Sequence, residues 1–399
     1  RLILDWGRFL YPGENRATTP MRFRDMARET IRFRANKSIG TIKGLLDGGV
    51  MENPNLKKKI LFDRTCKAVV IQGAHQAAIE EIEIPEVKPG DTLIRVAYEA
   101  VCATDIEIYE GTLGYYQNGI AKYPIVPGHE FSGRVVSVGS NVNHLDVGDL
   151  VVVECIQSCG SCEACQRENW IACRQRTELG VIGRNGGYAE YVVVPGRYVH
   201  RLPPDFDLMK ACLCEPLAVA LKGLKRLRRT WRDRKMQRQV AVVGAGSLGH
   251  LCARVLDLWG HRVTVFDQNR KRLRYFNGCG IALSDNLSGL GDFESLVEVT
   301  GNPDALDGIL HQSPAGARIL LLGLPYAHQQ YTFENIVAYD KMLVGSVGSA
   351  AKHFDLAIEL LPQIKTDVFM EKVLPLSRFK EAWEIASSGK HLKIILKIN

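Results

Sequence analysis

The clearest pattern of apolar and polar positions lies between residues 236 and 273. Val240 to Val243 form a short apolar run, as expected of a strand buried on both faces. A segment with apolar residues at helical spacing follows, and Arg262 to Phe266 make a second run after it. The pattern predicts a strand, a helix that begins near Leu248, and a second strand parallel to the first.

The first strand and the helix are joined by Gly244-x-Gly246-x-x-Gly249, with Ser247 and Leu248 inside the motif. The first glycine allows a tight turn, the second a close backbone approach to a pyrophosphate, and the third the packing of helix on strand. The helix N-terminus offers free N–H groups to the phosphates. Because each part falls where the motif requires it, the segment predicts a dinucleotide-binding site.

The second strand ends at Asp267, eighteen residues after Gly249. A carboxylate there accepts from a ribose 2′-OH and repels a 2′-phosphate, so it favours NAD over NADP. Three cationic residues, Arg270 to Arg272, follow at once. NADP therefore stays an alternative, with Arg272 a further candidate cofactor contact.

Elsewhere the apolar runs are short and are separated by Pro and Gly. Six of them precede the nucleotide motif and predict a barrel-like β domain: 67–71, 77–84, 92–100, 131–138, 150–154 and 187–194. After it, runs at 296–300, 318–323 and 342–346 alternate with helical segments, as in a doubly wound parallel sheet, and a last strand is predicted at 392–398. The fold class is α/β.

Composition indicates an ordinary globular protein. Hydrophobic residues make up 46% and charged residues 24% of the 399, and no apolar run reaches the ~18 residues of a membrane span. The net charge of +7 matches the excess of fourteen Lys and Arg over seven Asp and Glu within residues 1–64. We interpret this extension as a solvated arm that packs on the body or on another subunit, the alternative being a site for nucleic acid, a membrane surface or a partner.

The eleven cysteines include four within fifteen residues, Cys159, Cys162, Cys165 and Cys173. Four thiolates from one loop can close a tetrahedron around Zn²⁺ and leave no open position, which defines a structural site. Such clustering favours metal ligation in a reducing compartment over disulfides. We therefore predict a structural zinc and a cytoplasmic location.

Three further fragments carry metal-binding residue types. They are Cys102-Ala-Thr104-Asp105-Ile-Glu107, Gly128-His129-Glu130 and Cys214-Glu215-Pro216. One thiolate, one imidazole and one carboxylate would bind zinc and leave a position for substrate or water. Each fragment alone is unremarkable, and their co-occurrence with the cysteine loop and the nucleotide motif gives them weight.

From these motifs, residues 65–399 resemble the zinc-dependent medium-chain dehydrogenases, the superfamily of alcohol, sorbitol, threonine and glucose dehydrogenases. The resemblance implies a GroES-like catalytic domain and a Rossmann domain. We place an N-terminal extension at 1–63, the catalytic domain at 64–213 completed by 347–399, and the Rossmann domain at 214–346. The resemblance also implies that Cys102 and His129 bind a catalytic zinc, that Asp105 supports the histidine, and that Thr104 relays the substrate proton.

The remaining zinc ligand separates branches of this family. Alcohol dehydrogenases proper carry a cysteine where Glu215-Pro216 stands, and the Glu-Pro form is similar to the sorbitol, threonine and glucose branch. Glu130 and Glu215 are both candidate ligands, with Glu215 favoured because Pro216 fixes its backbone. Glu107 replaces a histidine that many relatives use in the proton relay.

These expectations combine into an NAD(P)-dependent zinc dehydrogenase that binds two zinc ions per chain. It would transfer a hydride between NAD(P) and a secondary alcohol or ketone, such as a polyol, sugar or related hydroxylated metabolite. The alternatives are a dehydrogenase of simple alcohols or aldehydes, and a catalytically silent nucleotide-binding protein whose arm binds nucleic acid or a partner. We expect a homodimer or homotetramer, with neither membrane nor nucleic acid as a partner.

Overall fold

The structure is a computed structural model that describes residues 65–324, 331 and 333–399. The basic extension, and the interpretation placed on it, lie outside the described residues. Within them no helix is long and apolar enough to cross a membrane.

An antiparallel hairpin opens the described chain, with strands β1 (Thr65–Gly73) and β2 (Gln76–Glu83). A seven-stranded sheet follows, in which β10-β5-β4-β3-β18-β17 are neighbours and β9 also pairs with β3. Its bounds are β3 Asp91–Ala100, β4 Phe131–Val138, β5 Leu150–Val153, β9 Tyr191–Pro195, β10 Val199–Arg201, β17 Val373–Pro375 and β18 Ile395–Lys397. All pairs are antiparallel except β17 with β18.

Short elements surround the cysteine loop. A three-stranded sheet contains β6 (Ile156–Gln157), β7 (Thr177–Leu179) and β8 (Gly183–Arg184). Between β6 and β7 lie α6 (Glu163–Gln166) and the 3₁₀ helix Trp170–Ala172. The other α-helices that accompany the hairpin and these two sheets are α4 Ala103–Glu110, α5 Gly114–Gln117, α7 Leu208–Ala211, α13 Ala351–Leu360 and α14 Phe379–Ser387.

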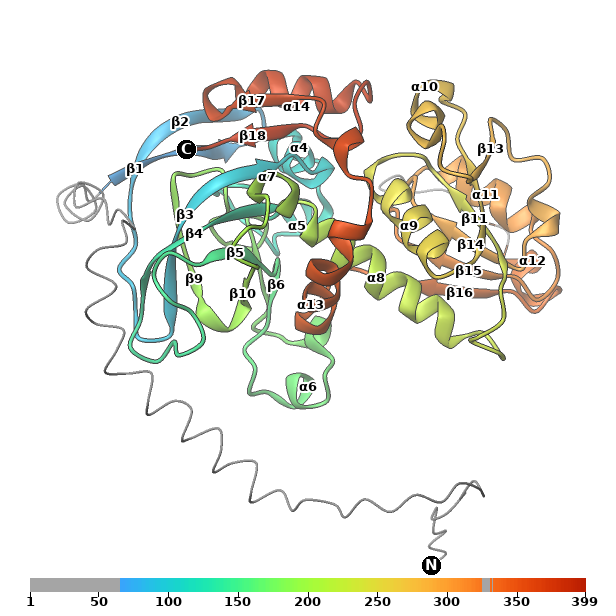
Figure 1. The fold of residues 1–399 in the computed structure, drawn as a ribbon, viewed down its shortest axis with the longest axis horizontal. Coiled ribbons are helices and arrows are strands. Elements are labelled where there is room, and N and C mark those ends of the chain that lie inside the picture. The colour runs from blue at the N-terminus through green and yellow to red at the C-terminus, as the bar shows by residue number, and fades with distance from the viewer. Residues whose placement is uncertain (1–64, 325–330, 332) are drawn as a thin grey trace, which may run out of the picture. The chain divides into compact units, whose positions relative to one another are not determined.

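The second large sheet is parallel and six-stranded, in the order β13-β12-β11-β14-β15-β16. Its strands are β11 Gln239–Val243, β12 Arg262–Phe266, β13 Ala282–Ser284, β14 Ser295–Glu298, β15 Arg318–Leu321 and β16 Met342–Gly345. The helices are α8 Cys214–Arg229, α9 Ser247–Leu258, α10 Arg270–Leu273, α11 Pro303–Gln312 and α12 Glu334–Val337 (Figure 1). This order, with the glycine motif after the central strand, is the Rossmann arrangement, so the predicted α/β fold class is confirmed.

The central strand β11 is buried on both faces, as expected of a strand inside a parallel sheet. Val240, Ala241, Val242 and Val243 are all buried, so both faces of β11 are covered. The largest hydrophobic cluster joins this sheet to α8, α9 and α13 and reaches Leu150 and Val152 of the other sheet. The two sheets therefore share a continuous core.

The C-terminal tail returns to the first sheet. Helix α13 packs on α8, α14 lies beside β17 and β18 (Figure 1), and β18 pairs antiparallel with β3, Ile395 opposite Ala100. The strand predicted at 392–398 is thus shorter, Ile395–Lys397, because Leu392 and Lys393 turn toward other partners. The strand predicted at 187–194 begins only at Tyr191, because a Cβ at Gly187 would lie 2.1 Å from the Glu99 carboxylate, so a close-packed loop occupies that position.

Candidate functional site

The first part of the site is the start of helix α4, directly after the buried strand β3. Cys102 occupies the N-cap position and is half-buried. Its backbone N–H donates to the Asp105 carboxylate at 2.9 Å, which satisfies one of the unpaired N–H groups at the helix start. Thr104 lies in the first turn, and Glu107 is three residues further on, on the same side of the helix.

Asp105 also fixes the loop that carries His129. It is fully buried, and it accepts from the Gly128 backbone N–H at 3.2 Å and from the Tyr188 hydroxyl at 3.4 Å. Gly128 has φ of +101° and a Cβ there would meet the Tyr188 ring at 2.5 Å, so only glycine fits this turn. One carboxylate therefore holds the backbones on both sides of the site.

The side chains of Cys102, His129 and Glu130 converge in this position. Their ligand atoms all lie within 4.8 Å of one another, and His129 and Glu130 are 6% and 3% exposed. The His129 Nδ1 makes no hydrogen bond within the described residues, and an Asp105 oxygen is 3.8 Å away. The group thus combines a thiol, a carboxylate and an imidazole whose buried nitrogen is free. Such a donor set suits Zn²⁺.

Negative charge dominates around this group. Burial opposes protonation of His129, but the Cys102 thiol and the Asp105 and Glu215 carboxylates outweigh it and raise the pKa of the imidazole well above its usual range. Burial likewise raises the pKa of Glu99, whose Oε1 accepts from the Glu130 backbone N–H at 2.9 Å. A site that stabilises a cation so strongly fits a metal ion.

Lys393 is a member of the site that sequence reasoning missed. Its Nζ lies 2.5 Å from the Glu130 carboxylate, and both side chains are buried. The preceding residue, Leu392, accepts a hydrogen bond from the Ser247 hydroxyl at the start of α9. Two adjacent residues of the tail, Leu392 and Lys393, thus contact the nucleotide loop and the metal-binding group. A single lysine in the tail gave no sequence signal of this contact.

Glu215 lies in the first turn of α8 and is buried, so its backbone is helical and the extended conformation expected of a residue before proline is wrong here. Burial raises the pKa of its carboxyl to about 7, against the opposing effect of His129. It belongs to the electrostatic surroundings of His129 but not to the compact group, which contains Glu130. Of the two candidate carboxylates, the geometry brings Glu130 to Cys102 and His129 in this arrangement, with Lys393 paired to it.

The four cysteines of the loop form a second group. Their sulfurs lie within 4.8 Å of one another, with 3.5 Å between Cys162 and Cys165 and 3.9 Å between Cys159 and Cys165. Zinc bonds of about 2.3 Å in a tetrahedron place sulfurs roughly 3.8 Å apart, so the spacing fits Zn²⁺. Hydrogen bonds from Ser161 and Cys162 lower the pKa of the Cys159 thiol to about 6. All eleven cysteines are free thiols.

The glycine motif adopts the turn that a dinucleotide site requires. Gly244 has φ of +115°, and a Cβ at Gly249 would lie 1.8 Å from the Gly244 carbonyl oxygen. Gly246 precedes α9, whose first turn contains Ser247 and Leu248. The first and third positions therefore tolerate only glycine, and the N-terminal N–H groups of α9 are available to an anion.

Asp267 stands at the end of β12 beside this turn. Its carboxylate accepts from the Ala245 backbone N–H at 2.7 Å and from the Asn269 N–H at 2.7 Å. Arg270 is paired with Asp285, which lowers the pKa of that carboxyl. Arg272 points toward the tail, since a Cβ at Gly389 would meet its guanidinium at 2.5 Å.

Comparison with known proteins agrees with the geometry. Residues 88–204 match the family described as "Alcohol dehydrogenase GroES-like domain", and 209–398 match "Glucose dehydrogenase C-terminus". An L-threonine 3-dehydrogenase from Streptomyces avermitilis is 33% identical over 65% of this chain and 77% of its own. An erythritol/L-threitol dehydrogenase from Mycolicibacterium smegmatis is 28% identical over 81% of this chain and 95% of its own.

Among solved structures, an alcohol dehydrogenase from Escherichia coli CFT073 complexed with NADH is 25% identical. It aligns with a TM-score of 0.75 over 84% of this chain and 100% of its own. The chain belongs to the zinc-dependent medium-chain dehydrogenases. It is an NAD(P)-dependent zinc dehydrogenase of alcohols or polyols.

Proposed function

We propose that the protein transfers a hydride between NAD and a secondary alcohol that carries further hydroxyl groups, such as a polyol, a sugar or a related metabolite. The single observation that carries this choice is a buried pair of charged residues beside the metal-binding group. The Glu178 carboxylate is 3.2 Å from the Arg176 guanidinium, with both side chains largely buried. Burial raises the pKa of Glu178 against the charges of Arg176 and His129, and the Glu178 charge in turn contributes to raising the pKa of Glu215, so Glu178 lies within electrostatic range of this group.

Polar groups in a closed site favour a substrate that can bond to them. A site built to hydrogen-bond a substrate hydroxyl rejects an analogue without it, because its own polar groups are then left unpaired. Arg176 also approaches the Tyr115 hydroxyl at 3.5 Å. We propose that the substrate lies against Glu178, whose buried Oε1 makes no hydrogen bond within the described residues. An apolar chain would leave that oxygen without a hydrogen bond, so the site favours polyols over simple alcohols.

Cys102 and His129 are proposed to hold a zinc ion together with a carboxylate, Glu130 or Glu215. The bound zinc supplies Lewis-acid polarisation of the substrate oxygen, and the nicotinamide supplies the hydride acceptor. Thr104, two residues after Cys102, is proposed to pass the substrate proton outward, with Glu107 as a later station. Asp105 is a positioning residue, because it bonds the backbones of Cys102 and Gly128. The four-cysteine loop is proposed to hold a structural zinc.

The preference for NAD over NADP is proposed from Asp267. Its carboxylate lies beside the glycine turn, where it would accept from a ribose 2′-OH and repel a 2′-phosphate. The competing cation Arg270 is already paired with Asp285. The cytoplasmic location and the homodimeric or homotetrameric state stay predictions.

A substrate panel tests the proposal. Sorbitol, erythritol, threonine and 2-butanol are compared with NAD and with NADP, following nicotinamide reduction by absorbance. We expect the polyols to give the highest kcat/KM, with NAD, and Glu178→Gln to lower kcat/KM for them at least tenfold more than for 2-butanol. Equal losses on both substrates, or a wild-type preference for 2-butanol, would reject the proposed substrate class while leaving the dehydrogenase assignment intact.

A further inference from the structure

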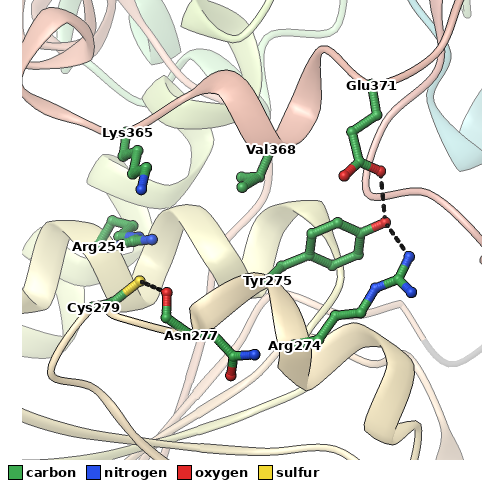
Figure 2. Close-up of a pocket in the computed structure, with 8 residues that line it drawn as sticks. All are labelled: Arg254, Arg274, Tyr275, Asn277, Cys279, Lys365, Val368 and Glu371. Atoms are coloured by element: carbon green, nitrogen blue, oxygen red, sulfur yellow. Dashed lines mark hydrogen bonds between the residues drawn. The ribbon is translucent and has the colours of Figure 1, made fainter.

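A pocket of about 240 Å³ lies away from both metal-binding groups, between the nucleotide-binding sheet's helices and the returning tail (Figure 2). One side is formed by Arg254 of α9 and by Arg274, Tyr275 and Asn277, which follow α10. Lys365 and Glu371 come from the tail segment after α13. Three cations therefore face one carboxylate in this pocket.

The carboxylate is already engaged. Glu371 accepts from the Tyr275 hydroxyl at 2.9 Å and pairs with His391 at 3.2 Å. The Tyr275 hydroxyl also lies 3.4 Å from an Arg274 nitrogen, so Arg274 is linked to Glu371 through it. Figure 2 shows these three side chains together on one side of the pocket. Arg254 and Lys365 are left without a carboxylate of their own there.

Arg254 is held in a fixed orientation. Its Nε donates to His250 Nε2 at 3.2 Å, and its guanidinium carbon lies 6.0 Å from the Phe276 ring centroid. Burial, followed by the Arg254 charge, lowers the pKa of His250 to about 3, so the imidazole is neutral and can accept. The Arg254 Nη2 is buried and has no hydrogen-bond partner within the described residues. A buried guanidinium N–H without an acceptor is costly, so an anion that reached this nitrogen after a small movement of the side chain would gain a favourable hydrogen bond.

Lys365 supplies the second cation from the opposite element. In Figure 2 its amine points toward the side of the pocket that Arg254 occupies. No ion pair of Lys365 or Arg254 is found in residues 65–324, 331 and 333–399. The nearby Asp367 pairs with Lys210 at 2.9 Å, and the Lys365 charge adds only the smallest of the effects that lower the pKa of that carboxyl. Arg254 and the exposed Lys365 repel each other only weakly through solvent, and an anion bound between them would turn this repulsion into attraction.

We propose that this pocket binds a phosphate group, either inorganic phosphate or a small phosphate monoester, between Arg254 and Lys365. The planar guanidinium suits phosphate oxygens and the ammonium adds a point charge.

The pocket is distinct from the cofactor's phosphate site. Arg254 stands seven residues beyond Ser247 in α9, which corresponds to roughly 10 Å along the helix axis. An occupant would contact α9 and the tail segment at the same time, and the tail also contacts α9 through Ser247 and Leu392. Phosphate and cofactor can therefore bind at the same time. Phosphate binding raises the thermal stability of the protein, because the ligand binds only the folded state.

Isothermal titration of inorganic phosphate into the full chain tests this, with NAD at saturation so that the pyrophosphate site is filled. Ionic strength is held constant with NaCl. We expect saturable binding and a rise in Tm of about 2–4 °C at high occupancy. Arg254→Gln and Lys365→Gln should each weaken binding at least tenfold, and the exposed Lys365 serves as the test if the Arg254 variant fails to fold. Arg262→Gln, an exposed residue at the start of β12, is the matched control and should bind normally.

A second titration with glycerol 3-phosphate separates the two sources. Tighter binding than inorganic phosphate assigns the pocket to a phosphorylated metabolite, and weaker binding assigns it to free phosphate. Absence of saturable binding, binding abolished by NAD, or binding unchanged in Lys365→Gln and Arg254→Gln would overturn the proposal. None of these outcomes depends on which alcohol the enzyme oxidises.

Discussion

The two metal-binding groups differ in how the chain assembles them. The four cysteines come from one loop of fifteen residues, and Cys159 and Cys162 are half-exposed. Cys102, His129 and Glu130 come from two segments and depend on Asp105, Glu99 and Lys393 for their positions, a span of almost 300 residues. A locally encoded group can be recognised from spacing alone, whereas the second needs the whole fold around it. Loss of one ligand should therefore have opposite consequences at the two groups.

The largest effect on activity is expected for Cys102→Ser. If the bound metal contributes several kcal/mol to the transition state, kcat/KM should fall by about 10³-fold or more, while the Tm stays close to that of the wild type. Steady-state kinetics and a thermal melt check both parts. Cys66→Ser, at a buried thiol of β1 outside both groups, is the control. A Cys102→Ser protein that retains normal turnover would remove this residue from the catalytic group.

Cys162→Ser should produce the converse. We expect about two zinc ions per wild-type chain by metal analysis, and about one in this variant, because the closed site loses a ligand. The Tm should fall by more than about 5 °C, since metal binding at such a loop is part of its folding free energy. The folded fraction should keep most of its kcat. A wild-type value near one zinc per chain with the cysteine loop empty would contradict the structural assignment.

A comparison of Glu215→Gln with Glu130→Gln sharpens the description of the buried group. We expect Glu215→Gln to lower kcat by roughly tenfold, the scale of a lost ligand or outer-shell support. Glu130 forms an ion pair with Lys393 at 2.5 Å, whereas the described residues contain no ion pair of Glu215, although the Lys393 charge acts on it from further away. If Glu130→Gln is inactive and Glu215→Gln turns over normally, then the carboxylate that binds zinc is Glu130, which must break its ion pair with Lys393 to do so.

The smallest effect is expected at the other locally encoded site, the glycine motif. Asp267→Ala should raise the KM for NAD several-fold and leave the KM for NADP nearly unchanged or lower, because acceptor and repulsion are removed together. Initial rates with each cofactor measure the ratio. A wild-type enzyme that already prefers NADP would show that the cations following Asp267 decide the choice.

Local signals in the sequence predicted local structure well. Strand β12 was expected at 262–266 and is found there, and the glycine motif and cysteine loop have the predicted forms. Apolar periodicity and ligand spacing act over a few residues, so the sequence alone contains that information. The assignments of catalytic and cofactor roles stay predictions.

Long-range pairings were beyond the sequence. Nothing in 392-LKI-394 indicates that Lys393 meets Glu130, which lies 263 positions earlier. The late start of β9 has the same origin, since Gly187 must pass within contact distance of Glu99 and Phe131. Such details are set by which strands become neighbours, and strand partners cannot be read from the period of one segment.

The insertion of β18 beside β3 has a consequence for biosynthesis. During translation, all strands of the parallel sheet have left the ribosome once Gly345 is clear, and helix α13, which packs on α8, follows directly. This half can therefore fold before the last strand is made. The first sheet must wait for residues 393–397, and until then the edge of β3 and the Glu130 carboxylate remain without their partners. The nascent chain therefore carries an incomplete sheet through most of its synthesis, with an open strand edge that chaperones would protect.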